Sequence, residues 1–426
     1  MKRIDLKPRS LEDYRPLVGD RLVEELYAQS AQLQGVRVAH INATAAGGGV
    51  AEILRSIVPL YQALGIDASW WVMDGSEPFF QITKQMHNAL QGAERDFSPE
   101  QWALYQSHNE AAAASIADDY DVIVVHDPQP AAIMRYARLR ARRWIWRCHI
   151  DTSRPHGPTW SAFRETVAGY DAAIFSVADF VAPGLDVSQV AIIPPAIDPL
   201  TPKNLPMDVD EARAFVASHG VDVERPFISQ ISRFDPWKDP LGVIACFKRL
   251  KQRHPDLQLV LLGNFADDDP EGQVIFEQVR AAADGVPDIS IITGLSDMVN
   301  PFQMLSRVVL QKSIREGFGL TVTEALWKGT PVVAGNVGGL RLQISEGVGG
   351  FLVDSVDECA ARVDYLLSHD EERQALGASG REHVRTHFLM PRLLRDELKL
   401  IGEVLGLPVE RPVSARPRDT SALAAG

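Results

Sequence analysis

The sequence predicts an α/β protein with two doubly wound domains, each built on a parallel sheet covered by helices. Short apolar runs, typical of buried strands, alternate with segments of helical spacing over residues 36–193, and the alternation restarts over residues 226–353. A stretch rich in proline and polar residues, 194–208, separates the two series as a linker would. We therefore expect an N-terminal domain at 1–205, a C-terminal domain at 206–390, a closing helix at 391–407 and a disordered tail at 408–426.

The first domain is expected to open with a helical lead-in over residues 1–34. Its strands are expected at residues 36–41, 67–73, 121–125, 144–150, 172–177 and 190–193. Residues 50–57 and 79–92 have helical spacing, and Gly92 suits the end of the second helix. Open parallel sheets place ligand-binding groups at the carboxyl ends of their strands, so the residues that follow these strands are the first candidates for a site.

The second domain repeats the alternation. Its strands are expected at residues 226–232, 257–262, 289–292, 308–310, 331–334 and 350–353. Helices are expected at residues 241–253, from 321 onward, and at 357–368, 370–386 and 391–405. The same rule about strand ends therefore selects a second set of candidates, and we expect the two sets to face each other.

Composition narrows the possible partners and compartments. Apolar residues make up 46% of the 426 residues and charged residues 23%, as in ordinary globular proteins, and the net charge of −13 argues against a nucleic-acid partner. Three cysteines, Cys148, Cys246 and Cys359, lack pair spacing, which indicates a reducing compartment and no metal cluster. The basic N-terminus has no apolar stretch after it, and no run approaches the ~18 apolar residues of a membrane helix. We expect a cytoplasmic protein without a membrane partner, and a homodimer whose interface no residue pattern indicates.

A glycine turn in the second domain is the strongest candidate for a binding element. Gly317-Phe318-Gly319 follows a buried strand and precedes a helix, so backbone amides near Gly319 and Leu320 are available to a phosphate. Glu316 precedes the turn and Glu324 lies inside the helix, with seven residues between them. Such separated carboxylates would hold hydroxyl groups at different places along an elongated ligand. A solvated helix start is the alternative.

Two cations follow the first strand of the second domain. Arg233 and Lys238 are five positions apart in the run Ser232-Arg-Phe-Asp-Pro-Trp-Lys238. Together they would neutralise a diphosphate without a metal ion, because arginine binds phosphate oxygens bidentately and lysine adds a point charge. The triplet Asp267-Asp268-Asp269 is interpreted as a solvated loop with helix-starting acids and not as a metal site.

The first domain contributes candidates at three strand ends. The glycines at 47–49 stand between a strand and a helix, the layout of a phosphate- or sugar-binding turn, although a plain tight turn has the same pattern. Asp127 and His149 end neighbouring strands, which favours a functional role over that of a core histidine. Asn88 lies on a predicted helix that could face a cleft, the surface or the core.

These motifs together resemble the retaining nucleotide-sugar glycosyltransferases of family four. The resemblance rests on the glutamates flanking Gly317-Phe318-Gly319-Leu320 and on the cations at 233 and 238. It implies the GT-B architecture, two Rossmann-like domains facing across a cleft, and it covers nearly the whole chain. In that family an arginine and a lysine after this strand hold the donor diphosphate.

A narrower resemblance is to the trehalose synthase (glycosyltransferring) family. It is carried by the runs at 40–44, 47–54, 87–92, 146–151 and 315–334. This family joins glucose from a nucleotide donor to free glucose, so the resemblance implies a nucleoside-diphosphate glucose as donor, no bound cofactor and, at most, stimulation by Mg²⁺. Nothing in the spacing of the residues themselves indicates trehalose.

The resemblance also implies roles for individual residues. Arg233, Lys238 and the amides near Gly319 and Leu320 would stabilise the leaving diphosphate. Glu316 would hold the donor sugar with His149, and Glu324 would hold the ribose. Gly48, Gly49, Asp127 and Asn88 would lie on the acceptor side. The family retains the configuration of the sugar, and no obvious carboxylate nucleophile is present, which suggests attack on the same face of the sugar. No residue matches a dedicated general base, so none is assigned.

Two other functions remain open at this point. A trehalose phosphorylase would use inorganic phosphate in place of the nucleotide as leaving group. A sugar-nucleotide-binding regulator would bind without turnover, but such a protein would be expected to lack some of the acids or cations named above.

Overall fold

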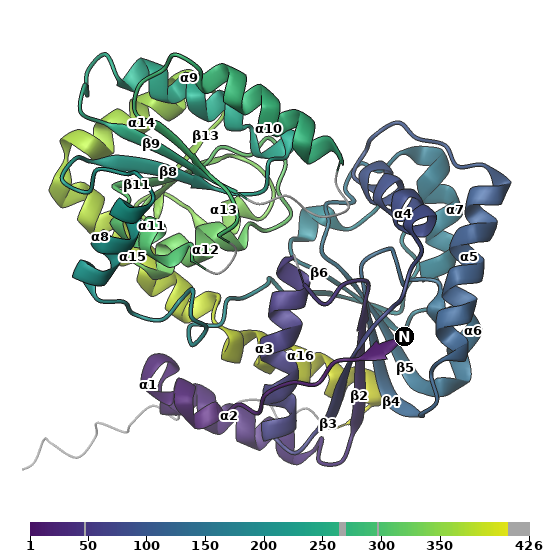
Figure 1. The fold of residues 1–426 in the computed structure, drawn as a ribbon. Helices are drawn as coiled ribbons and strands as arrows, with labels where there is room; N and C mark the ends of the chain where they lie inside the picture. Colours follow the sequence, from purple (N-terminus) through teal and green to yellow (C-terminus); the bar gives the residue numbers. More distant parts are fainter. Residues whose placement is uncertain (47, 264–269, 296–297, 408–426) are drawn as a thin grey trace, which may run out of the picture.

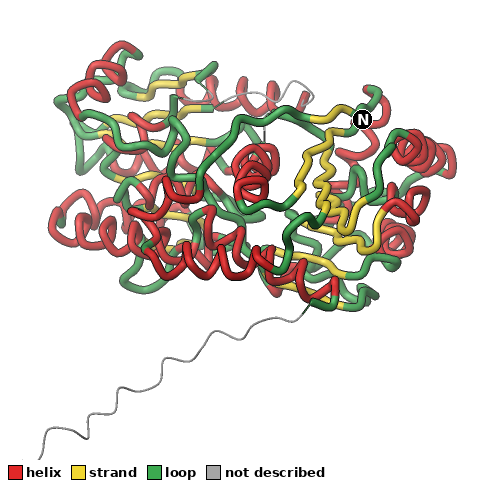
Figure 2. The backbone as a smooth tube through the Cα atoms, turned by 90° about the horizontal axis from the view of Figure 1, so that it is seen from below, coloured by secondary structure: helices red, strands yellow, loops and turns green. Residues whose placement is uncertain are grey.

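The computed structural model describes residues 1–46, 48–263, 270–295 and 298–407. The chain folds into two halves, each organised around a sheet (Figure 1). Helices flank the strands, as the view in Figure 2 also shows. The predicted α/β class with two doubly wound sheets is confirmed. Asp267, Asp268, Asp269 and residues 408–426 lie outside the described residues.

The N-terminal half carries a seven-stranded sheet in the order β1-β3-β2-β4-β5-β6-β7. Its strands are β1 (Lys2–Arg3), β2 (Arg37–Asn42), β3 (Asp67–Val72), β4 (Tyr120–His126), β5 (Ala141–Cys148), β6 (Ala172–Phe175) and β7 (Gln189–Ile192). All neighbours pair in parallel except β1, which pairs antiparallel with β3 through Lys2 and Val72. The antiparallel edge strand was not predicted, because two charged residues carry no strand signal.

Alternate residues of these strands face two separate cores, one on each side of the sheet. Val122 and Val124 of β4 pack in one core, while Ile123 and Val125 pack in the other. The side-chain period of two in a strand produces this division, and burial on both faces explains why the strand is a continuous apolar run.

Helices cover both faces of this first sheet. They are η1 (Leu11–Tyr14), α1 (Arg15–Val18), α2 (Asp20–Ala31), α3 (Gly49–Ala63), α4 (Glu77–Leu90), α5 (Pro99–Ala114), α6 (Ile133–Ala137), η2 (Arg138–Arg140), α7 (Gly157–Val167) and η3 (Ala178–Phe180). Helix α5 was not predicted, although its start carries a recognisable capping box between Ser98 and Gln101. The helix at 50–57 is longer than predicted, because Pro59 does not end α3.

The C-terminal half carries a six-stranded parallel sheet in the order β10-β9-β8-β11-β12-β13. Its strands are β8 (Phe227–Ile231), β9 (Gln258–Leu262), β10 (Ile289–Ile292), β11 (Val308–Gln311), β12 (Val332–Gly335) and β13 (Gly350–Val353). Its helices are α8 (Val209–Ser218), η4 (Pro236–Lys238), α9 (Pro240–Leu250), α10 (Pro270–Ala283), α11 (Asn300–Leu305), α12 (Leu320–Trp327), α13 (Leu340–Gln343), α14 (Val356–Ser368) and α15 (Asp370–His387).

The last helix, α16 (Met390–Leu405), returns to the N-terminal half. It packs against α2, α3 and β5, and its Leu393, Leu394 and Leu398 are buried in the core on that side of the first sheet (Figure 1). The strand order reverses between β2 and β4 in the first sheet and between β8 and β11 in the second. Such switch points are where open sheets leave a crevice for ligands. Gly48 and Gly49 follow β2, Asp127 follows β4, and Arg233 and Glu316 follow β8 and β11, whereas His149 follows β5 and Asn88 lies on α4.

Candidate active site

A cavity of about 710 Å³ lies between the two halves, at the carboxyl ends of both sheets. All of the site residues predicted from the sequence line it: Gly48, Gly49, Asn88, Asp127, His149, Arg233, Lys238, Glu316, Gly319, Leu320 and Glu324. The structure therefore brings together residues that are separated by up to 276 positions, from Gly48 to Glu324. Their assignment to individual chemical roles remains a prediction.

Glu316 is held in place at the end of the segment that follows β11. Its Oε2 atom lies 2.5 Å from Lys238 Nζ and accepts hydrogen bonds from Gln311 Nε2 and Ser313 Oγ, each at 3.1 Å. The carboxylate is thus buried beside a cation that comes from a different strand end. These three contacts fix the orientation of the Glu316 side chain in the cavity.

The glycine turn after Glu316 adopts a conformation that other residues avoid. Gly319 has φ of +83° and precedes α12, and a Cβ atom there would lie 2.9 Å from Leu340 Cδ2. No side chain caps the helix. The first amides of α12 are therefore left to the cavity, together with the partial positive charge of the helix start.

A second helix start meets the first across the cavity. Helix α3 begins at Gly49 without a side-chain cap, and a Cβ atom on Gly49 would lie 2.9 Å from Leu320 Cδ1. Only glycine fits this approach without displacing the leucine. The N-termini of α3 and α12 therefore converge from the two halves, an arrangement that attracts an anion.

Glu324 sits one turn further along α12 and belongs to a charged bridge. Lys203 Nζ lies 2.6 Å from Glu324 Oε1 and 2.7 Å from Glu52 Oε2, so a lysine of the interdomain segment links the two halves. Burial alone would lower the pKa of Lys203, but the two carboxylates raise it above its usual value. Sequence reasoning missed Lys203 because its position in a polar linker gives no sign of a partner far away in the chain.

Arg233 differs from the other charged groups of this wall. Its side chain is 47% exposed, and its nearest carboxylate contact is Asp235 Oδ2 at 3.8 Å. Trp237 and Arg315 were not predicted and stand beside it on the cavity wall. The Arg315 guanidinium lies over the Trp237 ring at 5.5 Å and donates to the carbonyl of Gln91 in the other half. Arg315 thus links the two halves at the cavity wall.

The N-terminal wall is built from Asp127 and His149. Asp127 has φ of +65°, and its Oδ1 atom accepts a hydrogen bond of 2.8 Å from the His149 amide. Burial raises the pKa of Asp127 to about 7, against the opposing effects of that hydrogen bond and of the Arg147 charge. Burial, with the Arg147 charge, keeps the pKa of His149 well below its usual value, so its ring is neutral near pH 7.

Helix α4 completes the wall with His87 and Asn88, both of which line the cavity. Burial lowers the pKa of His87 to about 3, and the charges of Lys84 and Arg233 act in the same direction. Asn88, predicted on the acceptor side, is half-buried on the same helix. His87, Asn88 and His149 of this wall are therefore uncharged hydrogen-bonding groups at neutral pH, and Lys84 adds one cation beside them.

Within the described residues, no group of three or more His, Cys, Asp or Glu side chains is arranged to hold a metal ion. No helix in the described part of the chain is long and apolar enough to cross a membrane.

Protein-family comparisons match each half of the chain. Residues 40–182 match the family described as "Trehalose synthase, N-terminal domain", and residues 212–383 match "Glycosyl transferases group 1". A trehalose synthase from Rubrobacter xylanophilus is 46% identical over 416 residues, which cover 96% of this chain and all of that one. A trehalose synthase from Pyrococcus horikoshii is 41% identical over 412 residues, covering 95% and 99% of the two chains.

More distant similarities place the fold. A trehalose phosphorylase from Pleurotus pulmonarius is 28% identical over 451 residues, covering 92% of this chain but 59% of its own length. Among solved structures, a UDP-forming α,α-trehalose-phosphate synthase from Burkholderia xenovorans superposes with a TM-score of 0.71 at 16% identity, covering 88% of this chain and 100% of that one. An E. coli structure described as "Trehalose-6-phosphate … bound with UDP-2-fluoro glucose" gives 0.69 at 16%, covering 87% and 99%. These likenesses show the GT-B fold.

Proposed function

Because the chain belongs to the trehalose synthase family of glycosyltransferases, we propose that it makes trehalose from a nucleoside-diphosphate glucose and free glucose. It is a glycosyltransferase enzyme by that membership. We further propose that it is a member of family four and that the sugar keeps its anomeric configuration during transfer. We place the boundary between the two domains at about residue 205.

The observation that carries the proposal is the convergence of two uncapped helix starts in one cavity. Gly49 opens α3 and Leu320 opens α12, and they approach to van der Waals contact between the two halves. Lys238 pairs with Glu316, which precedes the glycine turn, and Arg233 is a half-exposed cation that lines the same cavity. The diphosphate of the donor belongs here, where free amides and cations would stabilise the charge that develops on the leaving group.

The two glutamates are proposed to hold the ends of the donor. Glu316 precedes the phosphate-facing turn, so it would hold hydroxyls of the glucose and support positive charge on the ring. Glu324 lies beyond that turn, so it would hold the ribose. Lys203 pairs with both Glu324 and Glu52 of the opposite half. Ribose binding at Glu324 would therefore be coupled to this contact between the two halves.

The acceptor glucose is proposed to bind against Gly48, Gly49, Asn88 and Asp127, with His149 contacting the donor sugar. The attacking hydroxyl of the acceptor glucose would lose its proton to the leaving phosphate oxygen, on the same face of the donor sugar ring. In this step the bond from the anomeric carbon to the phosphate oxygen breaks as the bond to the acceptor oxygen forms. No separate general base is assigned.

Product analysis by NMR tests this function. The enzyme is incubated with glucose labelled with ¹³C at its first carbon and with UDP-, ADP- or GDP-glucose in turn. We expect α,α-trehalose and a nucleoside diphosphate in equal amounts from at least one donor. Glucose 6-phosphate is the second acceptor, because Lys84 also lines the cavity and would suit a phosphorylated sugar. Trehalose phosphate formed in place of trehalose would reject free glucose as the acceptor.

The phosphorylase alternative is favoured only by the more distant relatives. It is tested by incubating the enzyme with trehalose and inorganic phosphate without nucleotide. Formation of glucose 1-phosphate at a rate similar to nucleotide-dependent synthesis would replace the proposed donor.

We also propose a cytoplasmic homodimer without a bound cofactor, with Mg²⁺ stimulatory at most. Light scattering of the purified protein measures the oligomeric state.

A further inference from the structure

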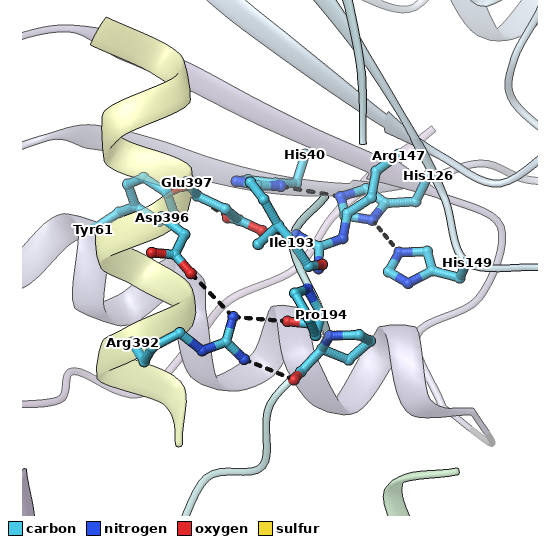
Figure 3. Close-up of polar contacts among 11 residues, drawn as sticks. His40, Tyr61, His126, Arg147, His149, Ile193, Pro194, Arg392, Asp396 and Glu397 are labelled. Atoms are coloured by element: carbon cyan, nitrogen blue, oxygen red, sulfur yellow. Dashed lines mark hydrogen bonds and ion pairs between the residues drawn. The ribbon is translucent and has the colours of Figure 1, made fainter. Parts of the chain in front are cut away.

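Three histidines form a continuous hydrogen-bonded chain from the core of the N-terminal half to the cavity. His40 lies on β2, His126 ends β4, and His149 follows β5, so they stand on three neighbouring strands. His40 Nδ1 lies 3.1 Å from His126 Nε2, and His126 Nδ1 lies 3.0 Å from His149 Nε2 (Figure 3). Only His149 lines the cavity.

All three rings are neutral near pH 7. Burial lowers the pKa of His40 to about 3, with a further contribution from the charge of Arg147. Burial also holds the pKa of His126 and of His149 well below the usual value. A neutral imidazole has one N–H donor and one lone-pair acceptor, so each hydrogen bond in the chain must run in a single direction.

The cation that faces this chain is itself fixed from elsewhere in the fold. The Arg147 guanidinium forms a buried ion pair with Glu397 of α16, and Tyr61 Oη of α3 donates to Glu397 Oε2 at 2.8 Å (Figure 3). Arg392, on the same helix, donates to the carbonyls of Pro194 and Pro195, each at 2.9 Å. Glu397 of α16 therefore fixes the Arg147 guanidinium of β5, and, in addition to burial, the Arg147 charge lowers the pKa of all three histidines.

The inner end of the chain decides its direction. His40 Nε2 is buried and has no hydrogen-bond partner in the described structure. If that atom carried the proton, an N–H donor would be buried without an acceptor, which native proteins avoid more strictly than an unused lone pair. The proton of His40 therefore belongs on Nδ1, where it is donated to His126.

This choice propagates to the cavity. His126 accepts at Nε2, so its own proton lies on Nδ1 and is donated to His149 Nε2. His149 accepts at Nε2, so its proton lies on Nδ1, an atom with no hydrogen-bond partner among the described residues. We propose that His40 and His126 are positioning residues that fix His149 as the Nδ1–H tautomer, which presents a single N–H donor to an uncharged sugar hydroxyl.

One mechanistic consequence follows. With Nε2 occupied as an acceptor and Nδ1 protonated, His149 has no lone pair left with which to take a proton from the acceptor glucose. It is therefore a hydrogen-bond donor and not a general base. The tautomer is inferred from the ring contacts and from the neutrality of the three rings, whereas its use toward a sugar rests on the proposed function.

The tautomer is measured directly by ¹⁵N NMR of the full-length wild-type protein labelled at histidine, at about pH 7. The His149 signals are assigned from their absence in His149→Gln. We expect His149 Nδ1 to show the shift of a protonated ring nitrogen and Nε2 that of an unprotonated one. The opposite pattern, or a doubly protonated ring, would overturn the proposal whether or not trehalose is formed.

A matched pair of variants tests the positioning role. In His126→Asn the side-chain amide can still donate from the place of Nδ1, whereas His126→Leu fills the space without a donor. We expect His126→Leu to return His149 to a mixture of tautomers and to lower kcat by about 10-fold with a smaller change in KM. His126→Asn should keep the Nδ1–H signal and recover kcat to within about 2-fold.

Several outcomes separate this proposal from the proposed function. Unchanged His149 shifts and unchanged kcat in a folded His126→Leu would overturn the positioning role. If His126→Leu does not fold, the comparison is made between wild type and His126→Asn, where loss of the Nδ1–H signal would count against the proposal. An Nδ1–H signal in an enzyme that makes no trehalose would reject the function and leave the positioning intact. His254→Leu, outside the cavity, serves as the control and should leave the His149 shifts unchanged.

Discussion

The two walls of the cavity manage charge in opposite ways. On the C-terminal wall, carboxylates and lysines stand in close pairs, Glu316 with Lys238 at 2.5 Å and Glu324 with Lys203 at 2.6 Å. On the N-terminal wall, His87 and His149 are neutral and burial raises the pKa of Asp127 to about 7. The C-terminal wall keeps these charges in pairs, whereas burial on the N-terminal wall favours the uncharged forms of the two histidines and of Asp127. Lys84 is a cation on that second wall.

This difference matches the chemistry of the two substrates proposed above. A nucleoside-diphosphate sugar brings negative charge, which needs cations and free amides that are already in place. Glucose is uncharged and needs donors and acceptors of fixed direction, which neutral side chains supply without the cost of desolvating an ion. If the two walls bind different substrates in this way, removing cations from the C-terminal wall should have the largest effect on activity.

Removing the cations should affect the C-terminal wall most strongly. Arg233→Ala and Lys238→Ala should each lower kcat/KM for the donor by about 10²-fold or more, because the leaving diphosphate loses its electrostatic support. Arg249→Ala is a matched control, since Arg249 has the same 47% side-chain exposure but pairs with Asp357 outside the cavity. Lys251→Ala is the matched control for Lys238→Ala, because the Lys251 side chain is 17% exposed and that of Lys238 is 18% exposed. Steady-state kinetics measure these effects. An equal loss of kcat/KM in the control variants would show that Arg233 and Lys238 have no specific role in binding the diphosphate.

The two glutamates should separate binding from catalysis. Glu324→Gln should weaken binding of the free nucleoside diphosphate by about 1–3 kcal/mol, the range for a charged hydrogen bond left unmade. Glu316→Gln should mainly lower kcat, because it removes support for a positive charge that develops only in the transition state. Calorimetry and kinetics together measure both effects. Weaker diphosphate binding in Glu316→Gln with none in Glu324→Gln would reverse the assignment.

Asp127 tests the neutrality of the opposite wall. A carboxyl group whose pKa is raised by folding binds more protons when folded, so its effect on stability worsens as pH rises from about 4 to about 7 and is constant above. Asp127→Asn should therefore be more stable than wild type by about 1–3 kcal/mol at pH 8, with the difference vanishing near pH 4.

Denaturant midpoints at several pH values measure this difference. We expect the stabilised variant to lose activity, since a group kept at a cost to stability is typical of a functional site. A variant that is less stable than wild type at pH 8 would show that the Asp127 charge is well solvated or well paired, and the contrast between the walls would fail on this residue.

The smallest effect is expected from chelation. If the cations and helix starts carry the diphosphate charge, activity measured with a chelator should stay within about 2-fold of the untreated enzyme, apart from any stimulation by Mg²⁺ acting on the free nucleotide. Complete loss of activity, restored by a divalent ion bound to protein ligands, would show that charge on the C-terminal wall is neutralised in another way.

The sequence predicted much of the C-terminal wall because its signals are local. Gly317 to Glu324 form one turn and one helix, and Arg233 and Lys238 follow one strand, so periodicity and glycine placement suffice. Lys203 was missed because its contact with Glu52 spans 151 positions, and a polar linker gives no sign of such a partner.

The N-terminal wall shows the same limit more clearly. His126 directly follows the strand predicted at 121–125, and His149 lies near the end of the strand predicted at 144–150. His40, however, lies 86 positions from His126, and their contact depends on β2 and β4 being neighbours in the sheet. Strand order is a product of packing and cannot be obtained from apolar runs alone. The helix α5 is a different case, because its capping box was present in the sequence and was overlooked.

The division between the walls is tested most directly by the salt dependence of the two substrates. We measure kcat/KM for the nucleoside-diphosphate glucose and, at saturating donor, for glucose, at about 50 and about 500 mM NaCl. The donor value should fall by about 3- to 10-fold as its charge is screened from the cations, while the glucose value should change by less than about 2-fold. A glucose value that falls as steeply as the donor value, or a donor value that salt leaves unchanged, would contradict the account.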